Sequence, residues 1–499
     1  MTILTAIIFV PILAAIAMVG IGTPAKKTAL AAAAINLLFA FVAWAQFDPA
    51  VAGYQLAGSF PILSKPELAF SVGADGITII LLLLTTIVTL CAVWMSPADK
   101  DDNKLFHVSS LLISAGALGA FLSTDLFFFY AFHELALIPT FLMIGIWGSG
   151  DNKRVAWKIT IYLGLGSLVL LAGLLALFIT SGSSSFSFDS LQTASQSISP
   201  EIQKWVFLPL LLGFGTLVSL FPLHSWAAPA YASAPTPTAM LHAGVLKKFG
   251  LYGLIRVAVP MLPEGAQAWT NLACILLLGN ILYVGLVTIA SRRLDHMLGN
   301  SSVMHMGYLF LGVFSLNTIG LNGAVLLMFA HGLSIALLFG LASKLRESTG
   351  TLEFGRLGGL GKSAPVLAFT FALGAFASIG LPGFTNFASE VLVFFGGFKD
   401  YVDLPIASKS LGALQITTIL AVLGVLISAI YMLRAYRAVF QGDKPVPEEG
   451  DPEITAADLT FSQRIPVTIL IAALIITGCL PFLLLRLLDS TTQLLAITP

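Results

Sequence analysis

Three ionisable side chains lie deep inside apolar stretches of the sequence. Glu134 stands in FFFYAFHELALIP (127–139), Lys248 stands in HAGVLKKFGLY (242–252), and Glu390 follows GLPGF (380–384). A charge at the centre of a membrane helix costs roughly 2.5–3.5 kcal/mol on insertion scales, so its presence there indicates a function. Desolvation disfavours the charged form of both kinds of group, so all three can exchange protons near neutral pH. The alternative is a buried ion pair that only locks two helices together.

Histidines add further titratable groups at similar depth. Five of the seven histidines lie in or beside apolar stretches, namely His133, His224, His242, His305 and His331. Histidine titrates within the physiological range, which makes these five candidates for a proton relay. Any single one is more typical of a hydrogen-bonded helix contact. Their spacing is not that of metal ligands, so no metal site is predicted.

Lys247 is a further relay candidate because it directly precedes Lys248. Adjacent residues of an α-helix point about 100° apart, so the two ammonium groups cannot face the same axis. We expect one of them to snorkel to the membrane surface or to meet a neighbouring subunit.

The composition places these residues in a membrane protein. The chain of 499 residues is 57% hydrophobic and only 10% charged, whereas a soluble domain carries about 25% charged residues. Segments of roughly 20 apolar residues predict an all-α, polytopic fold of about fourteen transmembrane helices. The seventh, twelfth and last spans are predicted at 205–226, 365–398 and 465–485. The equal numbers of basic and acidic residues, 25 each, give no indication of a nucleic-acid partner.

No cofactor is predicted on this chain. The sequence contains no Walker loop, no GxGxxG motif after a strand and no HExxH motif. Its three cysteines, Cys91, Cys274 and Cys479, each stand alone in an apolar run, which argues against an iron–sulfur cluster and a disulfide framework.

The basic residues between the predicted spans are distributed unevenly. Seventeen lie in loops on the side opposite the N-terminus, and six lie on the N-terminal side. Because Lys and Arg collect on the cytoplasmic side, both termini are predicted to be periplasmic, in a bacterial inner membrane. The apolar run 2–22 has no preceding basic residue, so it is predicted to be a retained first helix and not a signal peptide.

Two predicted spans are interrupted by proline at comparable places, in SLFPLHSW (219–226) and IGLPGFTN (379–386). Proline removes a backbone donor and breaks the helical hydrogen-bond ladder. The two breaks are five helices apart, so their surroundings have opposite topology. Paired broken helices in inverted halves indicate an ion or substrate site in each half. The alternative is two ordinary proline kinks.

Several motifs together resemble the antiporter-like membrane subunits of respiratory complex I, of the chain-4 type. The similarity runs from about residue 70 to residue 440. It is carried, in order, by FHELALIP (132–139), PLHSW (222–226), APT (234–236), GVLKKFGLYG (244–253), NSSVMHMG (300–307), AHGLS (330–334) and GLPGF (380–384). The resemblance implies four parts: helices 1–3 at 1–104, two inverted five-helix units at 105–259 and 270–437, and a loop with the last helix at 438–499.

The resemblance also implies roles for the buried charges. Glu134 matches the family's fifth-helix glutamate, Lys248 its eighth-helix lysine and Glu390 its twelfth-helix ionisable group. Two positions depart from the family pattern: Leu217 stands where a seventh-helix lysine is expected, and Asp295 stands where a further lysine is expected. The first departure removes the expected partner of Glu134, a role for which His133, His224 and Lys247 are the candidates.

The resemblance favours a proton-translocating subunit of a quinone oxidoreductase that takes electrons from NADH or another donor. The chain would belong to an enzyme only as a subunit, with the redox chemistry on other subunits. Its partners would be other membrane subunits, including homologous antiporter-like chains. One alternative is an Mrp-type cation/proton antiporter subunit, against which Glu390 argues. Another is a non-conducting structural subunit, which Leu217 favours.

Overall fold

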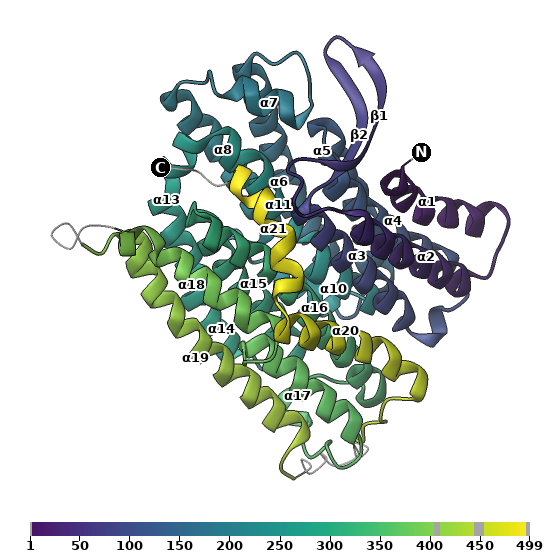
Figure 1. The fold of residues 1–499 in the computed structure, drawn as a ribbon. Helices are drawn as coiled ribbons and strands as arrows, with labels where there is room; N and C mark the ends of the chain where they lie inside the picture. The colour runs from purple at the N-terminus through teal and green to yellow at the C-terminus, as the bar shows by residue number, and fades with distance from the viewer. Residues whose placement is uncertain (1, 404–409, 444–453, 496–499) are drawn as a thin grey trace.

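The computed structural model describes residues 2–403, 410–443 and 454–495 (Figure 1). Lys409 and Lys444, which contribute to the uneven distribution of basic residues, lie outside the described residues. In chain order, the first half contains α1 (Ile3–Gly20), α2 (Ala25–Gln46), β1 (Gln55–Ser64), β2 (Glu67–Ala74), α3 (Gly76–Trp94), η1 (Ala98–Lys100), α4 (Lys104–Leu122), α5 (Leu126–Trp147), α6 (Asn152–Ser181), α7 (Phe188–Ser195), α8 (Pro200–Val218), α9 (Ala227–Ser233), α10 (Thr236–Leu241), η2 (His242–Leu246), α11 (Lys248–Gly253), η3 (Leu254–Ala258) and α12 (Val259–Met261).

The second half contains α13 (Pro263–Leu278), η4 (Gly279–Val284), α14 (Gly285–Ala290), α15 (Leu294–Phe314), α16 (Thr318–Thr349), η5 (Phe354–Arg356), α17 (Pro365–Ile379), α18 (Thr385–Asp403), α19 (Ala413–Phe440), α20 (Phe461–Cys479) and α21 (Phe482–Leu495). The segments η2, η3 and η4 are turns of π-helix within longer helices, and η1 and η5 are short 3-10 turns.

The described residues contain eleven helical stretches long and apolar enough to cross a membrane. They are α1 to α6, α8, the continuous stretch α13–α14, α16, α19 and α20. The other three predicted spans correspond to α15, to the segment α10–α12 with its π turns, and to the broken pair α17 and α18. The all-α, polytopic fold is therefore confirmed.

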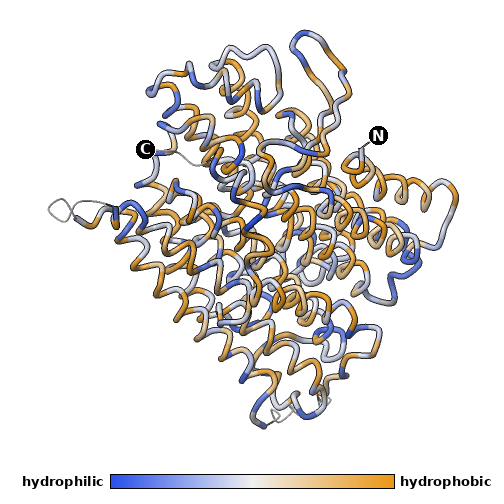
Figure 2. The backbone as a smooth tube through the Cα atoms, viewed as in Figure 1, coloured by the Kyte–Doolittle hydropathy of each residue, from blue (hydrophilic) through white to orange (hydrophobic). Residues whose placement is uncertain are grey.

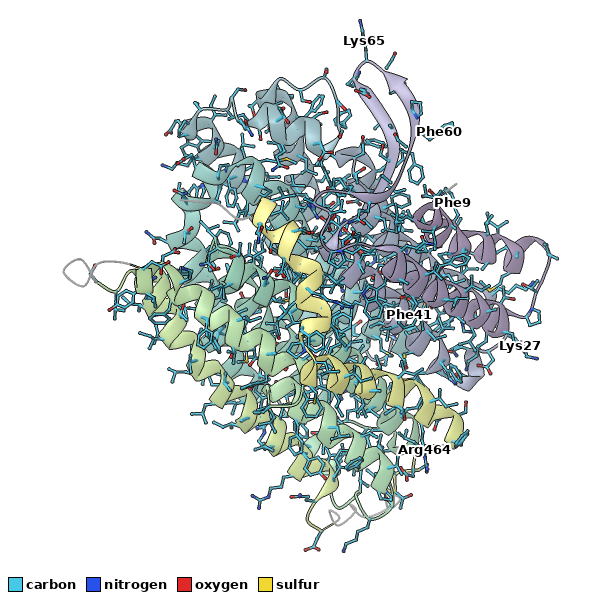
Figure 3. The ribbon with its side chains drawn as sticks, in the orientation of Figure 1. Phe9, Lys27, Phe41, Phe60, Lys65 and Arg464 are labelled. Atoms are coloured by element: carbon cyan, nitrogen blue, oxygen red, sulfur yellow. The ribbon has the colours of Figure 1, made fainter. Side chains whose placement is uncertain are left out.

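The centre of the bundle is formed by α3 and α16, whose apolar segments are entirely buried. The peripheral helices α1 and α2 consist mostly of hydrophobic residues (Figure 2). The side chains of Phe9 on α1 and Phe41 on α2 are exposed on the outside of the bundle (Figure 3). The strands β1 and β2 form an antiparallel hairpin, with Phe60 opposite Phe70 and Lys65 at its tip (Figure 3). This hairpin lies at the same end of the molecule as the N-terminus and α7 (Figure 1). We call this the hairpin end.

Both predicted helix breaks are present. In the seventh span, α8 ends at Val218, Ser219 takes a left-handed conformation (φ 70°), and helix resumes only at α9. Asn280 of η4 satisfies the freed backbone groups, since its side chain accepts from the Phe221 N–H (2.7 Å) and donates to the Ser219 carbonyl (3.0 Å). In the twelfth span, α17 ends at Ile379, Gly380 follows in a left-handed conformation (φ 81°), and α18 begins at Thr385.

The bounds predicted for the last span, 465–485, are wrong, and the prediction does not include the interruption that the structure has there. The helix begins at Phe461, is interrupted at Leu480 and Pro481, and continues as α21 to Leu495. Figure 1 shows α21 running from α20 towards the hairpin end. Polar residues in α21 lower its hydropathy, so the continuation is not visible as an apolar run. Its Thr491 hydroxyl accepts a hydrogen bond from the backbone N–H of Gly76 (3.1 Å), which ties the last span to α3.

The contact between α4 and α5 depends on the absence of a side chain at Gly116, because a Cβ there would lie 2.6 Å from the Phe132 carbonyl oxygen. We expect Gly116→Ala to lower the free energy of unfolding by about 1–3 kcal/mol through overpacking. The measurement is thermal unfolding of the purified full chain in detergent. Gly164→Ala in α6 is the matched control, since no atom lies within 4 Å of its Cβ position. Equal melting temperatures for the two variants would contradict the close approach of these helices.

Asp125 starts α5, since its carboxylate accepts from the N–H groups of Phe127 (2.9 Å) and Phe128 (3.3 Å). Burial raises the pKa of Asp125 from its ordinary value of 3.8 to about 6. Between these values the unfolded chain releases the proton and the folded chain retains it, so stability falls as pH rises from 4 to 6, by on the order of 2–3 kcal/mol. Asn caps helices equally well and does not titrate. Asp125→Asn should therefore gain melting temperature over wild type at pH 7.5 but not at pH 4, and a gain independent of pH would contradict this.

Candidate functional site

Lys248 occupies the middle of the eighth span with no exposed surface. Its ammonium group donates to the Ala243 carbonyl (2.8 Å) and lies 3.0 Å from Nδ1 of His331 on α16. The Ala243 carbonyl is available because η2 is π-helical, so that the Lys247 N–H bonds five residues back, to His242. π-Helical turns are frequent at functional sites. The local backbone therefore holds Lys248 in place and directs it towards His331.

His331 and His305 continue the line of titratable groups from Lys248. Their ring centroids lie 5.5 Å apart, and both side chains are buried. Both ring nitrogens of His305 face carbonyl oxygens, Nδ1 that of Ser301 (2.8 Å) and Nε2 that of Ser378 (2.9 Å). Only a doubly protonated imidazole can donate to both carbonyls. Each ring nitrogen of His305 thus has an acceptor for a proton.

Glu390 lies beside the second helix break, with a side chain that is 4% exposed. A Cβ at Gly380 would lie 2.5 Å from its Oε2, and the positive φ of Gly380 (81°) favours glycine at this break. In the described part of the chain, its Oε1 has no hydrogen-bond partner. The Tyr308 ring, whose buried hydroxyl also has no partner there, lies 5.8 Å from that of His305.

Lys247 is also fully buried, which makes the expectation that one lysine would snorkel or meet a neighbouring subunit wrong. Its ammonium group lies 3.3 Å from the Ser302 hydroxyl and 5.3 Å from the centre of the Tyr231 ring. The Tyr231 hydroxyl in turn lies 3.3 Å from Nδ1 of His242. The eighth span is surrounded by protein on all sides, so two lysines 100° apart both point into the bundle.

Glu134 lies apart from both lysines. It accepts a hydrogen bond from the Ser167 hydroxyl, which lies 3.0 Å from that of Tyr130, and its Oε1 is 3.7 Å from Nδ1 of His133. No hydrogen bond or ion pair among the described residues joins Glu134 to a lysine. The His133 ring stacks on Phe249, with centroids 3.9 Å apart, and Phe249 directly follows Lys248 in the chain. Of the three candidate partners of Glu134, only His133 comes near it.

The remaining sequence-predicted groups lie elsewhere. His224 stacks on Phe221 (5.5 Å between centroids) beside the first helix break, and no contact in the described residues joins it to a site lysine or carboxylate. Asp295 is buried in an ion-pair cluster, bonded to Arg293 (2.8 Å) and Arg346 (2.6 Å). Arg346 also donates to the Ala232 carbonyl (3.0 Å) after the first break. Asp295 therefore ties α15, α16 and α9 together.

Sequence reasoning missed several hydroxyl and amide groups that complete the site. Ser167, Tyr130 and Ser302 contact the predicted charges, and Asn280 supports the first break. Tyr130 could have been found, because it lies one helical turn before Glu134 in the same apolar stretch. The sequence does not single out Ser167 or Ser302, since a serine costs little free energy in a membrane helix. No group of three or more His, Cys, Asp or Glu side chains within the described ranges could hold a metal ion.

Comparison with known proteins gives a consistent result. A family described as "NADH:quinone oxidoreductase/Mrp antiporter, TM" matches residues 123–433, which include Glu134, Lys248 and Glu390. The chain is similar to NAD(P)H-quinone oxidoreductase chain 4 1 of Synechococcus elongatus, with 36% identity over 445 residues, or 88% of this chain and 82% of the relative. It is also similar to NADH-quinone oxidoreductase subunit M of Rickettsia bellii, with 32% identity over 437 residues, or 87% and 85%.

Two solved structures share its fold. A chain of respiratory complex I from Thermus thermophilus with bound NADH superposes with a TM-score of 0.85 and 29% identity, over 99% of each chain. A chain of the Mrp complex from Dietzia sp. superposes with a TM-score of 0.84 over 99% of this chain and 97% of the other. The latter is 19% identical, so this likeness concerns the fold alone.

Asp295 is expected to act in stability. Asp295→Asn removes two ion pairs and leaves the partly buried Arg346 without its carboxylate, which should lower the free energy of unfolding by about 3 kcal/mol. The measurement is again thermal unfolding of the full chain in detergent. Asp403→Asn is the control, because its pair with Lys399 is exposed on both sides and lies within the single helix α18. A melting temperature equal to that of the control would contradict the structural role.

Proposed function

The chain belongs to the NADH:quinone oxidoreductase/Mrp antiporter family of transmembrane proteins, and on that premise we propose that it translocates protons as a membrane subunit of a complex I-like NAD(P)H-quinone oxidoreductase. It is a multi-pass membrane protein. The curated relatives named above are chains of quinone oxidoreductases. The enzymatic activity belongs to the whole complex, and we place its redox centres on other subunits.

The observation that carries this proposal is the line of titratable groups from Lys248 towards Glu390. Lys248 is in contact with His331 (3.0 Å), and the ring of His305 lies 5.5 Å further on. The ring of Tyr308, whose hydroxyl has no partner in the described residues, lies 5.8 Å from that of His305, and Tyr308 interacts electrostatically with Glu390. Intramembrane chains of ionisable side chains are typical of proton pumps and transporters. A purely structural ion pair would need a carboxylate beside Lys248, and the described residues provide none in contact with it.

The exposure of Glu134 supports the proposal that another subunit binds to this face of the chain. Its side chain is 39% exposed on the surface of the isolated chain. It borders a hollow of about 210 Å³ between α5 and α6, whose lining is mostly apolar and includes Leu137, Ile138 and Leu163. A carboxylate at membrane depth is not left facing lipid. We therefore propose that another membrane subunit, such as a homologous antiporter-like chain, covers this face.

Orientation and internal organisation are part of the same proposal. We propose that both termini and the hairpin end face the periplasm, since Lys and Arg are concentrated at the opposite end. Figure 3 shows Arg464 near that opposite end and Lys65 at the hairpin tip. We further propose that residues 105–259 and 270–437 form the two inverted five-helix units, each with one of the two broken helices.

Lys248→Met provides the test, because methionine retains most of the side-chain length and volume while removing the proton-carrying group. We expect the complex to assemble and the number of protons moved per NAD(P)H oxidised to fall. The measurement is proton uptake by inverted membrane vesicles, recorded together with NAD(P)H oxidation. Lys27→Met, at an exposed position on α2, is the matched control and should leave the ratio unchanged.

The alternatives appear as other outcomes of this test when sodium movement is recorded in the same vesicles. An unchanged ratio in Lys248→Met, with the complex assembled, would favour a non-conducting structural subunit. A loss of sodium movement with no loss of proton movement driven by NAD(P)H would favour an Mrp-type cation/proton antiporter.

A further inference from the structure

Asn280 lies on η4, the π-helical turn between α13 and α14, and has no exposed surface. Besides its two bonds to the first helix break, with the Phe221 N–H and the Ser219 carbonyl, its side chain makes a third. Its Nδ2 also donates to the Val303 carbonyl of α15 (2.9 Å). Both donors of the amide are thus used, and the Phe221 N–H fixes which way the amide faces, because only its oxygen can accept. One buried side chain therefore joins the break to α15.

The first break and the helix after it also pack closely against η4 and α15. A Cβ at Gly279 of η4 would lie 2.5 Å from the Phe221 ring. A Cβ at Gly299 of α15 would lie 2.7 Å from the Cα atom of Ala228 on α9. Small residues at such places let membrane helices approach closely. The break thus rests on η4 and α15 with little room between them.

The turn of α15 that Asn280 holds also contacts the titratable groups. In this turn, the hydroxyl of Ser302 lies 3.3 Å from the ammonium group of Lys247. Nε2 of His305 faces the Ser378 carbonyl (2.9 Å), which belongs to the last turn of α17, just before the second break. The same turn of α15 therefore contacts the first break through Asn280 and the end of α17 through His305.

We propose that Asn280 is a positioning residue for proton transfer, which holds the first helix break and this turn of α15 together as one unit. Without the amide, the break and α15 would be free to shift independently, and the distance from His305 to His331 would no longer be fixed. Proton transfer depends on such distances, because donor and acceptor must come within hydrogen-bond reach, directly or through one water. Asn280 itself carries no proton. This inference rests on the proposed function, since it adds a positioning residue to the same path.

A purely structural role of Asn280 predicts a different result. If its amide only satisfied backbone groups that the break leaves free, its loss would lower stability and leave transport by each assembled complex unchanged. Asn36 on α2 is the matched control, because it is also buried and its Nδ2 donates to the Ile7 carbonyl of the peripheral helix α1 (3.0 Å). Leucine at either position leaves a buried backbone group without its partner. Both substitutions therefore cost stability, and only Asn280→Leu is expected to alter transport.

The experiment measures protons moved per NAD(P)H oxidised in inverted vesicles that contain the assembled complex. We expect Asn280→Leu to lower this ratio towards that of Lys248→Met, and Asn36→Leu to keep the wild-type ratio. A wild-type ratio in Asn280→Leu while Lys248→Met is defective would overturn the positioning role and leave the proposed function standing. An equal loss in Asn36→Leu would also overturn it, because the loss of any buried amide would then lower the ratio. A wild-type ratio in Lys248→Met would instead remove the proposed function itself.

Asn280→Ala keeps the proposal testable if leucine prevents assembly. The space that alanine leaves can admit water, which satisfies the freed backbone groups without fastening the break to α15. We expect the same loss of the proton ratio, together with faster hydrogen exchange in the peptide that contains Phe221 than in wild type or in Asn36→Ala. Exchange is measured by mass spectrometry on the purified complex. A wild-type ratio in the assembled Asn280→Ala complex, or unchanged exchange in this peptide, would overturn the proposal.

Discussion

The bilayer interior offers no hydrogen-bond partners, so every charge and every freed backbone group must be satisfied within the protein. The site depends on this constraint. The π turn η2 frees the Ala243 carbonyl, and the ammonium group of Lys248 takes it up. The break after α8 frees groups that Asn280 binds. Near the end of α17 the Ser378 carbonyl faces His305. Irregular backbone and titratable side chains therefore satisfy one another, which explains why they occur together.

The two halves of the chain meet the constraint differently. On the side of Glu390, a lysine, two histidines and a tyrosine follow one another at short distances. On the side of Glu134, the lysine position of the seventh helix is Leu217, and hydroxyl groups of Ser167 and Tyr130 surround the carboxylate instead. His133, beside Glu134, stacks on Phe249, the residue that follows Lys248 in the chain. Glu134 thus faces the edge of the chain, where a second subunit can complete its surroundings.

Features that cost much free energy inside a bilayer were predictable from the sequence, and features that cost little were not. Buried charges and proline breaks cost much free energy in a membrane helix, and apolar spans are recognisable by their composition. Lys248, Glu390 and the approximate positions of the fourteen spans could therefore be predicted from the sequence. Serine and asparagine contacts have little cost in a helix and no fixed spacing, so Ser167 and Asn280 stayed hidden. The α21 segment was missed because its polar residues resemble a loop. The burial of Lys247 was missed because an isolated helix gives no information on how many neighbours surround it.

The eighth span carries the buried lysine from which the proposed proton path starts. Lys248 uses two of its three N–H donors, for the Ala243 carbonyl and for His331, and no carboxylate of the described residues is in contact with it. A lysine held by a carbonyl and an imidazole ring is not locked in an ion pair, so small movements of its flexible stem can make and break the contact with His331. Under the proposed function, this freedom is what allows Lys248 to pass a proton on to His331 as well as to hold one.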